Sequence, residues 1–415
     1  MNDVFDVAVI GGGPAGMMAA GRAAELDARV ILLEKNPEPG KKLMMTGGGR
    51  CNILNAEFDM HKLTAKYGKK GKSLYSVFSQ FGPEATWIFF ESLGLKLKVE
   101  PENRAFPVSD STEDVRRVLT EFMSKGKVTL VTGNRVRGLK HADGMITKIV
   151  QDAGSIQAKN IILATGGKSR PETGSTGDGF KWMREIGIEV GEPEAALVPV
   201  SIRNTWVKDV SGISLKDVKL TAWQGKIKHE SQSGKMLFTH YGLSGPLVLN
   251  MSRNIGSLLK TGDVTLSLDL FPKLDLGALD KKIVEVFERG KNKMIKNSVG
   301  ELVQPRLGLV ILQLAGIVPE TPLHQLTREN RLAFGSFLKD LPMKVSGLLG
   351  ADQAIVTGGG VDLKEVDFKT MRSKKFQNLF LAGDILDFDR PSGGFSLQIC
   401  WSTGYVAGSG AAGPG

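Results

Sequence analysis

The chain has 415 residues, of which 41% are hydrophobic and 24% charged, as in a globular protein long enough for more than one domain. Two cysteines exclude a disulfide-rich scaffold, and the longest apolar run, 307–318, is interrupted by Gln313 and too short to span a bilayer. A net charge of +10 agrees with attraction to nucleic acid, to an anionic membrane or to phosphate-bearing cofactors, and equally with a solvated lysine surface.

The start of the chain predicts a strand, a tight turn and a helix. An apolar run at 7–10 is followed by glycines in the G-x-G-x-x-G spacing of dinucleotide-binding proteins. Gly11 permits the turn, Gly13 lets a pyrophosphate approach the backbone, and Gly16 lets the helix pack closely on the strand. Pro14 suits the first helical turn, whose free N–H groups and dipole favour an anion. We therefore expect a phosphate at this turn.

A second apolar strand, 29–33, ends in Glu34, near the offset at which an acidic side chain binds the ribose hydroxyls of a dinucleotide. Asp27 stands where a glycine often ends the intervening helix, and it tolerates a left-handed conformation better than most residues. The unit 6–35 therefore predicts binding of an adenine dinucleotide.

The loop 36–55 contains the segment TGGGRCN. Three consecutive glycines, 47–49, favour neither helix nor strand, so we expect them to let the main chain lie against a flat ligand. Arg50, Cys51 and Asn52 follow with a charge, a thiol and an amide. The alternative is an ordinary surface turn.

Later motifs decide which dinucleotide is bound. The strand 160–163 runs into Ala164, Thr165 and Gly166, and the strand 379–382 runs into Gly383 and Asp384. FAD is longer than NAD, and its ribityl chain and isoalloxazine ring need contacts from such distant segments, so we expect non-covalent FAD. Asp384 can accept from ribityl hydroxyls, while the helix that opens at Gly393-Gly394 can direct N–H groups at the flavin N1/C2 region. The predicted cofactor contacts are Gly11, Gly13, Pro14, Ala15, Gly16, Glu34, Lys35, Gly48, Gly49, Arg50, Cys51, Asn52, Val136, Ala164, Thr165, Gly166, Gly383, Asp384, Gly393, Gly394 and Phe395.

The periodicity predicts an α/β cofactor domain that both ends of the chain assemble. Between these ends, alternating strand-like runs indicate a β-rich insertion, and amphipathic runs indicate a helical one. Within the cofactor domain we expect a helix over 74–95, a loop over 103–112, a small sheet or hairpin from 128–131 and 145–150, and a strand that passes the adenine at Val136. The predicted division is 1–190 and 358–415 for the FAD domain, 191–274 with 342–357 for the β-rich insertion, and 275–341 for the helical insertion.

Several motifs together resemble those of the BaiN-like flavoproteins, a family labelled NAD(P)/FAD-dependent or aminoacetone-oxidase-family FAD-binding enzymes. They are GGGPAG (11–16), LLEK (32–35), TGGGRCN (46–52), ATGG (164–167), FTHYGLSGP (238–246), TGGGV (357–361), LAGDILD (381–387) and SGGFSLQ (392–398). The resemblance runs nearly end to end and implies a split Rossmann-like FAD domain of the two-dinucleotide-binding type with β-barrel-like and helical insertions. Activities assigned in that family include reduction of conjugated C=C bonds in steroid-like enones and of uracil to dihydrouracil in ribosomal RNA.

We therefore expect an oxidoreductase in which NAD(P)H, bound only transiently, reduces FAD, and the flavin N5 delivers hydride to a C=C bond conjugated to a carbonyl. Cys51, His240 and Tyr241 are candidate proton donors, although Cys51 as a packing residue and His240 as a structural one are the simpler alternatives. Two rivals are an FAD-dependent oxidase or dehydrogenase of a small amine, and a non-catalytic FAD-bound scaffold that binds RNA. Histidines and cysteines show no metal-binding spacing.

The expected substrate is ribosomal RNA or a small-molecule enone. The lysines that gather in the helical region favour RNA, because they are poorly placed to serve cofactor phosphates; these are Lys281, Lys282, Lys291, Lys293 and Lys296. An N-terminus that carries Asp3 and Asp6 and enters a strand at once predicts a cytoplasmic protein without a membrane segment. The sequence leaves the oligomeric state open.

Overall fold

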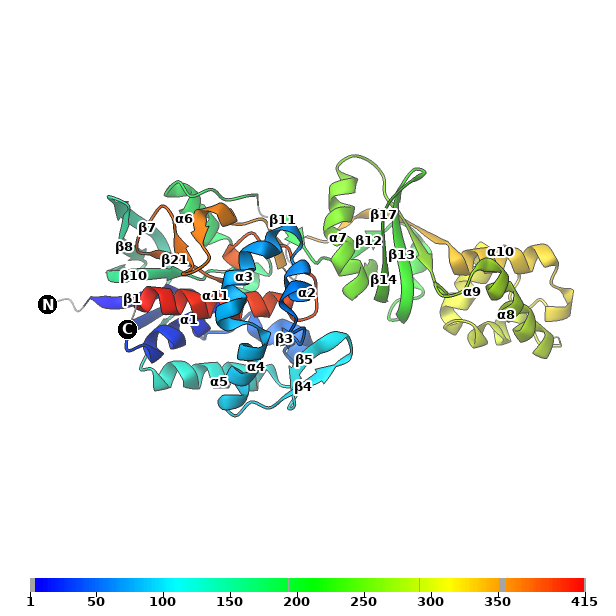
Figure 1. Cartoon of the computed structure of the whole chain (residues 1–415). Helices are drawn as coiled ribbons and strands as arrows, with labels where there is room; N and C mark the ends of the chain where they lie inside the picture. Colours follow the sequence, from blue (N-terminus) through cyan, green and yellow to red (C-terminus); the bar gives the residue numbers. More distant parts are fainter. Residues whose placement is uncertain (1–3, 193, 291, 351–355, 414–415) are drawn as a thin grey trace. The chain divides into compact units, whose positions relative to one another are not determined.

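The computed structural model describes residues 4–192, 194–290, 292–350 and 356–413, and it divides into two compact units (Figure 1). Unit 1 comprises residues 1–195 and 354–415, and unit 2 comprises residues 196–353. Each unit has its own hydrophobic core. Unit 1 is thus assembled from both ends of the chain.

A seven-stranded sheet organises unit 1, in the order β19-β20-β21-β10-β1-β2-β6. The five strands from β21 to β6 are parallel, and the residues at the centre of β1 are completely buried, as in a sheet covered on both faces. The strands are β1 (Phe5–Ile10), β2 (Val30–Glu34), β6 (Thr129–Thr132), β10 (Ala158–Leu163), β19 (Val366–Asp367), β20 (Arg372–Ser373) and β21 (Leu379–Leu381). Because parallel strands end at one edge, Gly11, Ala164 and Gly383 lie at the same edge of the sheet.

Helices α1 (Pro14–Glu25) and α11 (Phe395–Ala412) lie side by side against this sheet, although they come from opposite ends of the chain (Figure 1). A Cβ atom at Gly404 would lie 2.5 Å from the Ala15 carbonyl oxygen, and one at Gly408 would lie 2.5 Å from that of Ala19. Glycine at these positions therefore lets the two backbones touch. The other helices of unit 1 are α2 (Met60–Ala65), α3 (Tyr75–Phe81), α4 (Pro83–Ser92), α5 (Thr112–Lys125) and α6 (Asp178–Glu185).

Smaller sheets surround this core. The structure of unit 1 corrects three local predictions. The predicted loop 103–112 contains a strand, β5, that pairs with two others, and 128–131 joins β2 in the main sheet rather than forming a hairpin with 145–150. The predicted helix 74–95 is interrupted at Gly82, because Pro83 begins a new helix. The additional strands are β3 (Leu54–Asn55), β4 (Leu97–Glu100), β5 (Arg104–Pro107), β7 (Val136–Ala142), β8 (Met145–Gln151), β9 (Gly154–Ile156), β11 (Glu194–Ala196) and β18 (Val356–Gly358).

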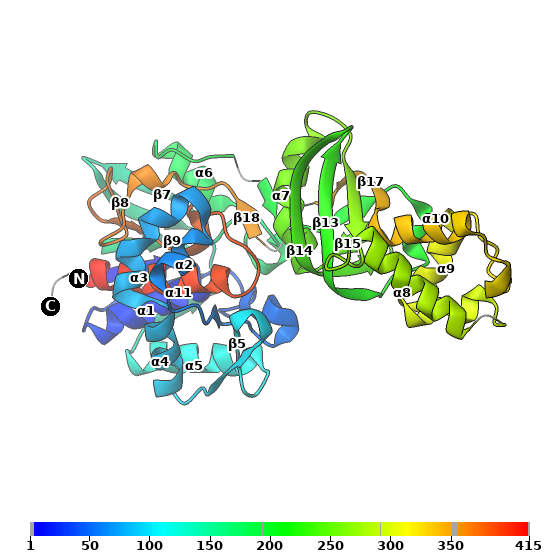
Figure 2. The same cartoon turned by 45° about the vertical axis from the view of Figure 1, so that its right-hand side comes forward.

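Unit 2 contains a closed six-stranded barrel in the order β12-β15-β14-β13-β16-β17. Side chains alternate along each strand, and Leu220, Phe238 and Leu266 are completely buried inside. Helix α7 (Pro246–Leu259) packs along β14 (Figure 2). The strands are β12 (Val200–Ile202), β13 (Ser214–Gln224), β14 (Ile227–Thr239), β15 (Gly242–Ser244), β16 (Thr265–Asp269) and β17 (Leu341–Leu348).

Three helices lie between β16 and β17 in the chain and form the helical part of unit 2. They are α8 (Leu276–Arg289), α9 (Pro305–Leu314) and α10 (Arg328–Lys339). Each is amphipathic, with buried residues such as Ile283, Ile311 and Phe334 that join the core of the barrel. Two of them have side-chain caps at their N-termini: Asp275 accepts from the Ala278 N–H at the start of α8, and Thr327 forms a capping box at the start of α10.

Candidate cofactor site

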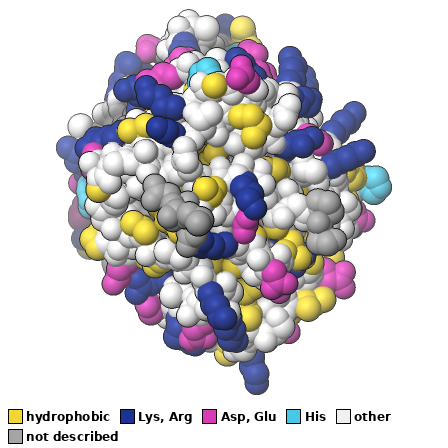
Figure 3. Space-filling model, turned by 90° about the vertical axis from the view of Figure 1, so that its left-hand side faces the viewer, with side chains coloured by type: hydrophobic (Ala, Val, Ile, Leu, Met, Phe, Trp, Pro, Cys, Tyr) yellow, Lys and Arg dark blue, Asp and Glu magenta, His cyan; other side chains and the backbone are white. Residues whose placement is uncertain are grey.

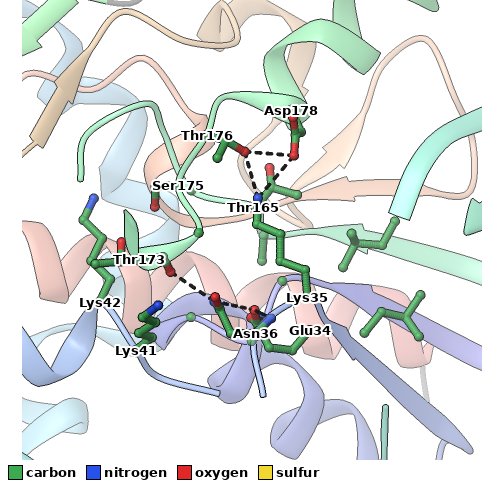
Figure 4. A pocket seen from close by; sticks show the side chains of 18 of the residues that line it. Glu34, Lys35, Asn36, Lys41, Lys42, Thr165, Thr173, Ser175, Thr176 and Asp178 are labelled. Atoms are coloured by element: carbon green, nitrogen blue, oxygen red, sulfur yellow. Dashed lines mark hydrogen bonds and ion pairs between the residues drawn. The ribbon is translucent and has the colours of Figure 1, made fainter. Parts of the chain in front are cut away.

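A pocket opens at the edge of the main sheet where β1, β2 and β10 end (Figure 4). Its walls come from the start of α1, the ends of β2 and β10, the start of β7, and the segment 173–178. Of the predicted cofactor contacts, eleven line it: Gly11, Gly13, Pro14, Ala15, Glu34, Lys35, Val136, Ala164, Thr165, Gly166 and Asp384. Residues from five separate parts of the chain are thus brought together.

The glycine-rich turn before α1 has the geometry of an anion site. A Cβ atom at Gly13 would meet no atom within 4 Å, so this backbone faces open space, whereas one at Gly16 would lie 1.8 Å from the Gly11 carbonyl oxygen. Gly11 itself has φ +105°. Pro14 is at the start of α1, and no acidic residue occupies its first turn. Free N–H groups and the positive end of the helix dipole therefore face the pocket, and no acidic side chain of the helix itself opposes them.

Glu34 is held in place at the end of β2. It is 7% exposed; its Oε2 accepts from the Gly12 N–H at 2.7 Å and its Oε1 accepts from the Asn36 N–H at 2.7 Å. The Asn36 amide also donates to Oε1 and to the Thr173 carbonyl oxygen, at 2.7 and 3.0 Å (Figure 4). The carboxylate is thus oriented beside the anion-binding turn.

The segment 173–178, a glycine-rich turn that leads into α6, forms a wall of the pocket and is not among the predicted cofactor contacts. Lys35 Nζ donates to Thr176 Oγ1 at 2.8 Å and lies 3.2 Å from Asp178 Oδ2, and Arg135 Nη2 donates to the same carboxylate at 2.8 Å (Figure 4). Burial opposes ionisation of Asp178, but the hydrogen bonds from Thr176 and Arg135 and the charge of Lys35 outweigh it and lower the pKa of its carboxyl group. Through Asp178 this network joins Lys35, which follows β2, to Arg135, which comes directly before Val136 at the start of β7.

Two buried polar atoms in the pocket wall have no hydrogen-bond partner among the described residues. They are Thr165 Oγ1 and Asn134 Oδ1. Since a buried polar group without a partner costs free energy, both atoms fit a pocket that is completed by a polar ligand.

Asp384 belongs to a group of buried charges at the other side of the pocket. Its Oδ1 accepts from Arg390 Nη2 at 2.5 Å, and its Oδ2 lies 3.7 Å from Lys42 Nζ. Lys42 also donates to Ser169 Oγ at 2.7 Å, and burial lowers the pKa of its ammonium group. Two cations thus surround one carboxylate and leave a net positive charge. The sequence analysis missed Lys42, whose partners are distant in the chain, and also Arg390, although Asp384 lies only six residues before it.

The TGGGRCN segment lies outside this pocket wall. Gly48 and Gly49 have φ of +68° and +88°, and Cβ atoms there would meet nothing within 4 Å. The Arg50 side chain turns towards Glu100 and Asp110, with which it forms ion pairs, and its guanidinium lies 4.3 Å from the centre of the Phe106 ring.

Cys51 and Asn52 are anchored inside unit 1. Cys51 is completely buried, and this burial raises the pKa of its thiol to about 12, so it is a neutral thiol at pH 7. With its amide oxygen facing the Gly394 N–H at 3.0 Å, Asn52 donates to the Leu54 and Ala105 carbonyl oxygens. The loop is thereby joined to the start of α11.

The start of α11 is shaped by two glycines. Gly393 and Gly394 have φ of +112° and +97°, and a Cβ at Gly394 would lie 2.3 Å from the Leu54 carbonyl carbon. Phe395 is buried, and its carbonyl oxygen accepts from the Tyr67 hydroxyl at 3.0 Å. At the end of β21, Gly383 has φ +76°, and its N–H donates to Thr403 Oγ1 at 2.9 Å. These contacts fix α11 relative to the carboxyl ends of the strands.

His240 and Tyr241 follow β14 in unit 2. Both are exposed, His240 Nδ1 lies 3.3 Å from Ser211 Oγ, and the two rings make an edge contact. Their role stays a prediction.

In the part of the chain that the structure describes, no group of three or more His, Cys, Asp or Glu side chains could hold a metal ion. No helix of those residues is long and apolar enough to cross a membrane.

Comparison with known proteins identifies the family. Residues 5–410 match the family model described as HI0933-like protein Rossmann domain. The 3-dehydro-bile acid delta(4,6)-reductase of Clostridium scindens is 31% identical over 98% of both chains, and the ribosomal RNA dihydrouridine synthase of Escherichia coli is 29% identical over 97% of this chain and 96% of the relative. The two relatives are named for different substrates.

Solved structures show the same fold. A 3-ketosteroid-delta4-(5alpha)-dehydrogenase from Rhodococcus jostii is 15% identical, with a TM-score of 0.56 over 100% of this chain and 98% of that one. A flavocytochrome c3 fumarate reductase is 18% identical, with a TM-score of 0.54 over 99% of this chain and 78% of that one. The predicted Rossmann-like fold class with inserted subdomains is confirmed. The chain belongs to the HI0933-like Rossmann family, a family of FAD-dependent oxidoreductases.

Proposed function

We propose that the protein is an NAD(P)H-driven, FAD-dependent reductase of C=C bonds conjugated to a carbonyl, and that its substrate is a uracil in ribosomal RNA. The observation that supports it most is the pocket at the sheet edge, whose anion-binding turn, fixed carboxylate and unpartnered polar atoms suit a dinucleotide. The two relatives named as a bile acid reductase and an RNA dihydrouridine synthase support the reaction class.

In this proposal the start of α1 binds the pyrophosphate of FAD, with Gly13 leaving room for it. Glu34 accepts from the ribose hydroxyls, and the backbone at Val136 lies beside the adenine, between the wall 173–178 and the end of β2. Thr165 Oγ1 and Asn134 Oδ1 gain the hydrogen-bond partners that they lack. The positive charge of the Lys42–Asp384–Arg390 group adds to the field that holds the anionic cofactor.

FAD supplies hydride transfer between the nicotinamide and the substrate C=C bond. The protein contributes orientation and proton control. The N-terminus of α11 and the open face of Gly48 and Gly49 suit a flat, electron-accepting ring, because the helix dipole favours negative charge there. A side chain must then donate a proton to the carbon that does not receive hydride. Burial makes Cys51 a weak acid, so His240 and Tyr241, both exposed, are the preferred donors.

A small enone is the second candidate substrate. The relative with the higher identity of the two, 31%, is named for a bile acid, which is a small molecule. An oxidase of a small amine and a non-catalytic scaffold remain alternatives that the same assays address.

The test is to give FAD-loaded protein and NADPH or NADH either ribosomal RNA lacking the modification or a 3-keto-Δ4 steroid, and to measure dihydrouridine by mass spectrometry and steroid reduction by chromatography. Dihydrouridine that depends on the protein and on NAD(P)H supports the proposal. Reduction of the steroid alone would assign the small enone, and consumption of oxygen with a small amine as the electron donor, without NAD(P)H, would assign an oxidase.

Variants at the two candidate donors test proton control. Tyr241→Phe and His240→Gln should keep FAD bound, and the true donor's variant should lower kcat about 100-fold, within the usual contribution of general acids. Tyr75→Phe, another exposed tyrosine, in unit 1, is the matched control. If both donor variants keep full kcat, neither residue is the proton donor.

A further inference from the structure

Most of the net positive charge of the protein lies in unit 2. Its 158 residues carry 21 Lys and Arg against 14 Asp and Glu, whereas the rest of the chain carries 33 against 30. Cations are scattered among acids and neutral residues on the face of the molecule in Figure 3, where no continuous positive patch is visible. The net positive charge of unit 2 raises the question of where its lysines and arginines lie on the surface.

The outer face of the barrel places part of this charge in register. Trp223 on β13 is paired directly with Lys228 on β14 and with Thr265 on β16, and Thr265 is paired with Lys344 on β17. Directly paired residues point to the same face of a sheet, so Lys228, Trp223, Thr265 and Lys344 form one row across four strands. At the usual strand spacing this row is about 14 Å long.

Neighbouring positions extend this face. Lys219 is paired with Ser233, and Lys235 lies two residues further along β14, hence on the same side. Between these lysines and the row, Thr221 and Ser231 hydroxyls are hydrogen-bonded at 2.9 Å, and Ser267 is paired with Thr221. We call this surface the outer barrel face; it consists of Lys219, Thr221, Trp223, Lys228, Ser231, Ser233, Lys235, Thr265, Ser267 and Lys344.

The lysines of this face have no acidic partner within the described residues. Lys228, Lys235 and Lys344 are exposed, and Lys219 and Trp223 are half-buried. Asp269, the carboxylate beside Lys219, is already paired with Lys339 Nζ at 2.7 Å. The face thus combines four cations, several hydroxyl groups and one accessible indole ring, with one acid at its edge, Asp340, whose Oδ1 accepts from Ser267 Oγ at 2.5 Å.

The lysines of the helical part, which the sequence analysis favoured, are arranged differently. Lys296 is paired with Glu320 at 2.9 Å, and Lys282 lies 5.1 Å from the centre of the Phe271 ring. Lys291 lies outside the described residues. Residues 275–341 as a whole carry ten Lys and Arg against eight Asp and Glu, so most of their charge is balanced.

We infer that the outer barrel face binds single-stranded RNA, a step that rests on the proposed RNA substrate. Lysines that lack acidic partners release counterions when they contact phosphates, and hydroxyl groups bond to phosphate and sugar. Trp223, flanked by Lys228 and by hydroxyls, provides a ring on which one base stacks, and stacking does not depend on the identity of the base. The surface therefore holds the strand that carries the target uridine.

The test uses FAD-loaded full-length protein and a fluorescent single-stranded oligouridylate, with affinity measured by anisotropy from 50 to 300 mM salt. The triple variant Lys219→Gln/Lys228→Gln/Lys344→Gln should bind more weakly and lower the log-log salt slope by about 2, since each lost phosphate contact accounts for about 0.7 on a single strand. Trp223→Ala should weaken binding about 10-fold or more, whereas Trp223→Phe should retain most of the affinity. Lys281→Gln/Lys282→Gln/Lys293→Gln is the control with the same charge change, and FAD content and thermal unfolding check that all variants fold.

An unchanged slope in the triple variant, with a lowered slope in the control, would overturn this surface and move the RNA contact to the helical part. Equal losses in Trp223→Phe and Trp223→Ala would overturn the stacking role. If the unmodified protein bound no oligouridylate at 50 mM salt, the RNA substrate itself would be wrong, whereas a failure of the barrel variants alone leaves that substrate intact.

Discussion

The two units use different parts of the polypeptide for recognition. In unit 1 the pocket is formed largely by backbone: glycines that leave space, helix N-termini that supply N–H groups, and strand ends that meet at one edge. In unit 2 the outer barrel face consists of side chains aligned by strand register. A site formed by backbone can be recognised from glycine motifs in the sequence. The register between paired strands produces almost no local signal in the sequence.

The most severe test of the backbone site in unit 1 is Gly13→Val. Because its Cβ would point into open space, the protein should fold, while the added side chain occupies the place of the pyrophosphate. We expect FAD affinity to fall at least 100-fold, or about 2.7 kcal/mol, measured as flavin content after purification and by titration. Gly138→Val is the matched control, since its Cβ also meets nothing within 4 Å but lies outside the pocket. Full flavin content in Gly13→Val would place the pyrophosphate elsewhere.

A smaller loss is expected from the side chain that the sequence places on the ribose of the cofactor. Glu34→Ala removes an acceptor for the ribose and also leaves the Gly12 and Asn36 N–H groups without their partner. Hydrogen bonds to charged groups contribute about 1.5–3 kcal/mol, so FAD affinity should fall about 10- to 150-fold. Titration of apoprotein with FAD measures this, with the exposed Glu84→Ala as control. Equal affinities in the two variants would remove Glu34 from the ribose site.

How much of the fold and of the site could be predicted from the sequence depends on whether the signal is local in the chain. The strand, turn and helix at the start of the chain, the strands that run into Ala164 and Gly383, and the left-handed Asp27, with φ 62°, follow from local sequence and are confirmed. The Asp178 network with Lys35 and Arg135 could not be read, because its members are over 40 residues apart and polar residues beside glycines are common in turns. The available signal was the glycine-rich sequence TGSTGDG at 173–179, since glycine-rich turns before helices often approach ligands.

The outer barrel face was missed for another reason. β13 and β14 pair with two register shifts, at 215/218 and at 222/223, and each irregularity changes which side chains share a face. Sequence alternation therefore could not place Lys228 beside Trp223. Lysines clustered along the chain, as at 281–282, were visible instead, although clustering in sequence says nothing about acidic partners in space.

Replacement of Gly48 tests whether backbone outside the pocket wall also contacts the cofactor. Gly48→Val should shift the flavin absorbance bands and lower FAD affinity several-fold, because its open Cβ direction is where the flat ring is proposed to lie. Gly94→Val is the control, as Gly94 has a similar left-handed backbone, φ +85°, and equally open surroundings, so it carries the same strain without the ligand. Native spectra in Gly48→Val would leave the TGGGRCN loop as a structural turn.

The last prediction compares how the stabilities of the two units depend on pH. Burial raises the pKa of the Cys51 thiol to about 12 and also raises the pKa of Cys400 and Tyr67, and all three belong to unit 1, whereas unit 2 contains no cysteine. An acid whose pKa is higher in the folded state is fully stabilising below its unfolded pKa and loses that contribution as the pH rises above it. The free energy of unfolding of unit 1 should therefore fall above pH 9 by about 1.4 kcal/mol per pH unit for each group that ionises only on unfolding.

FAD release in urea between pH 8 and 10.5 follows unit 1, and hydrogen exchange of the barrel strands follows unit 2. Cys51→Ala removes one of these groups, so the free energy of unfolding of unit 1 should fall less steeply with pH. Loss of packing should also lower the stability of this variant at pH 8. Barrel strands that lose protection at the same pH as FAD is released would show that the two units unfold together. Barrel strands that stay protected after FAD release would show that the buried thiols act on unit 1 alone, as their positions require.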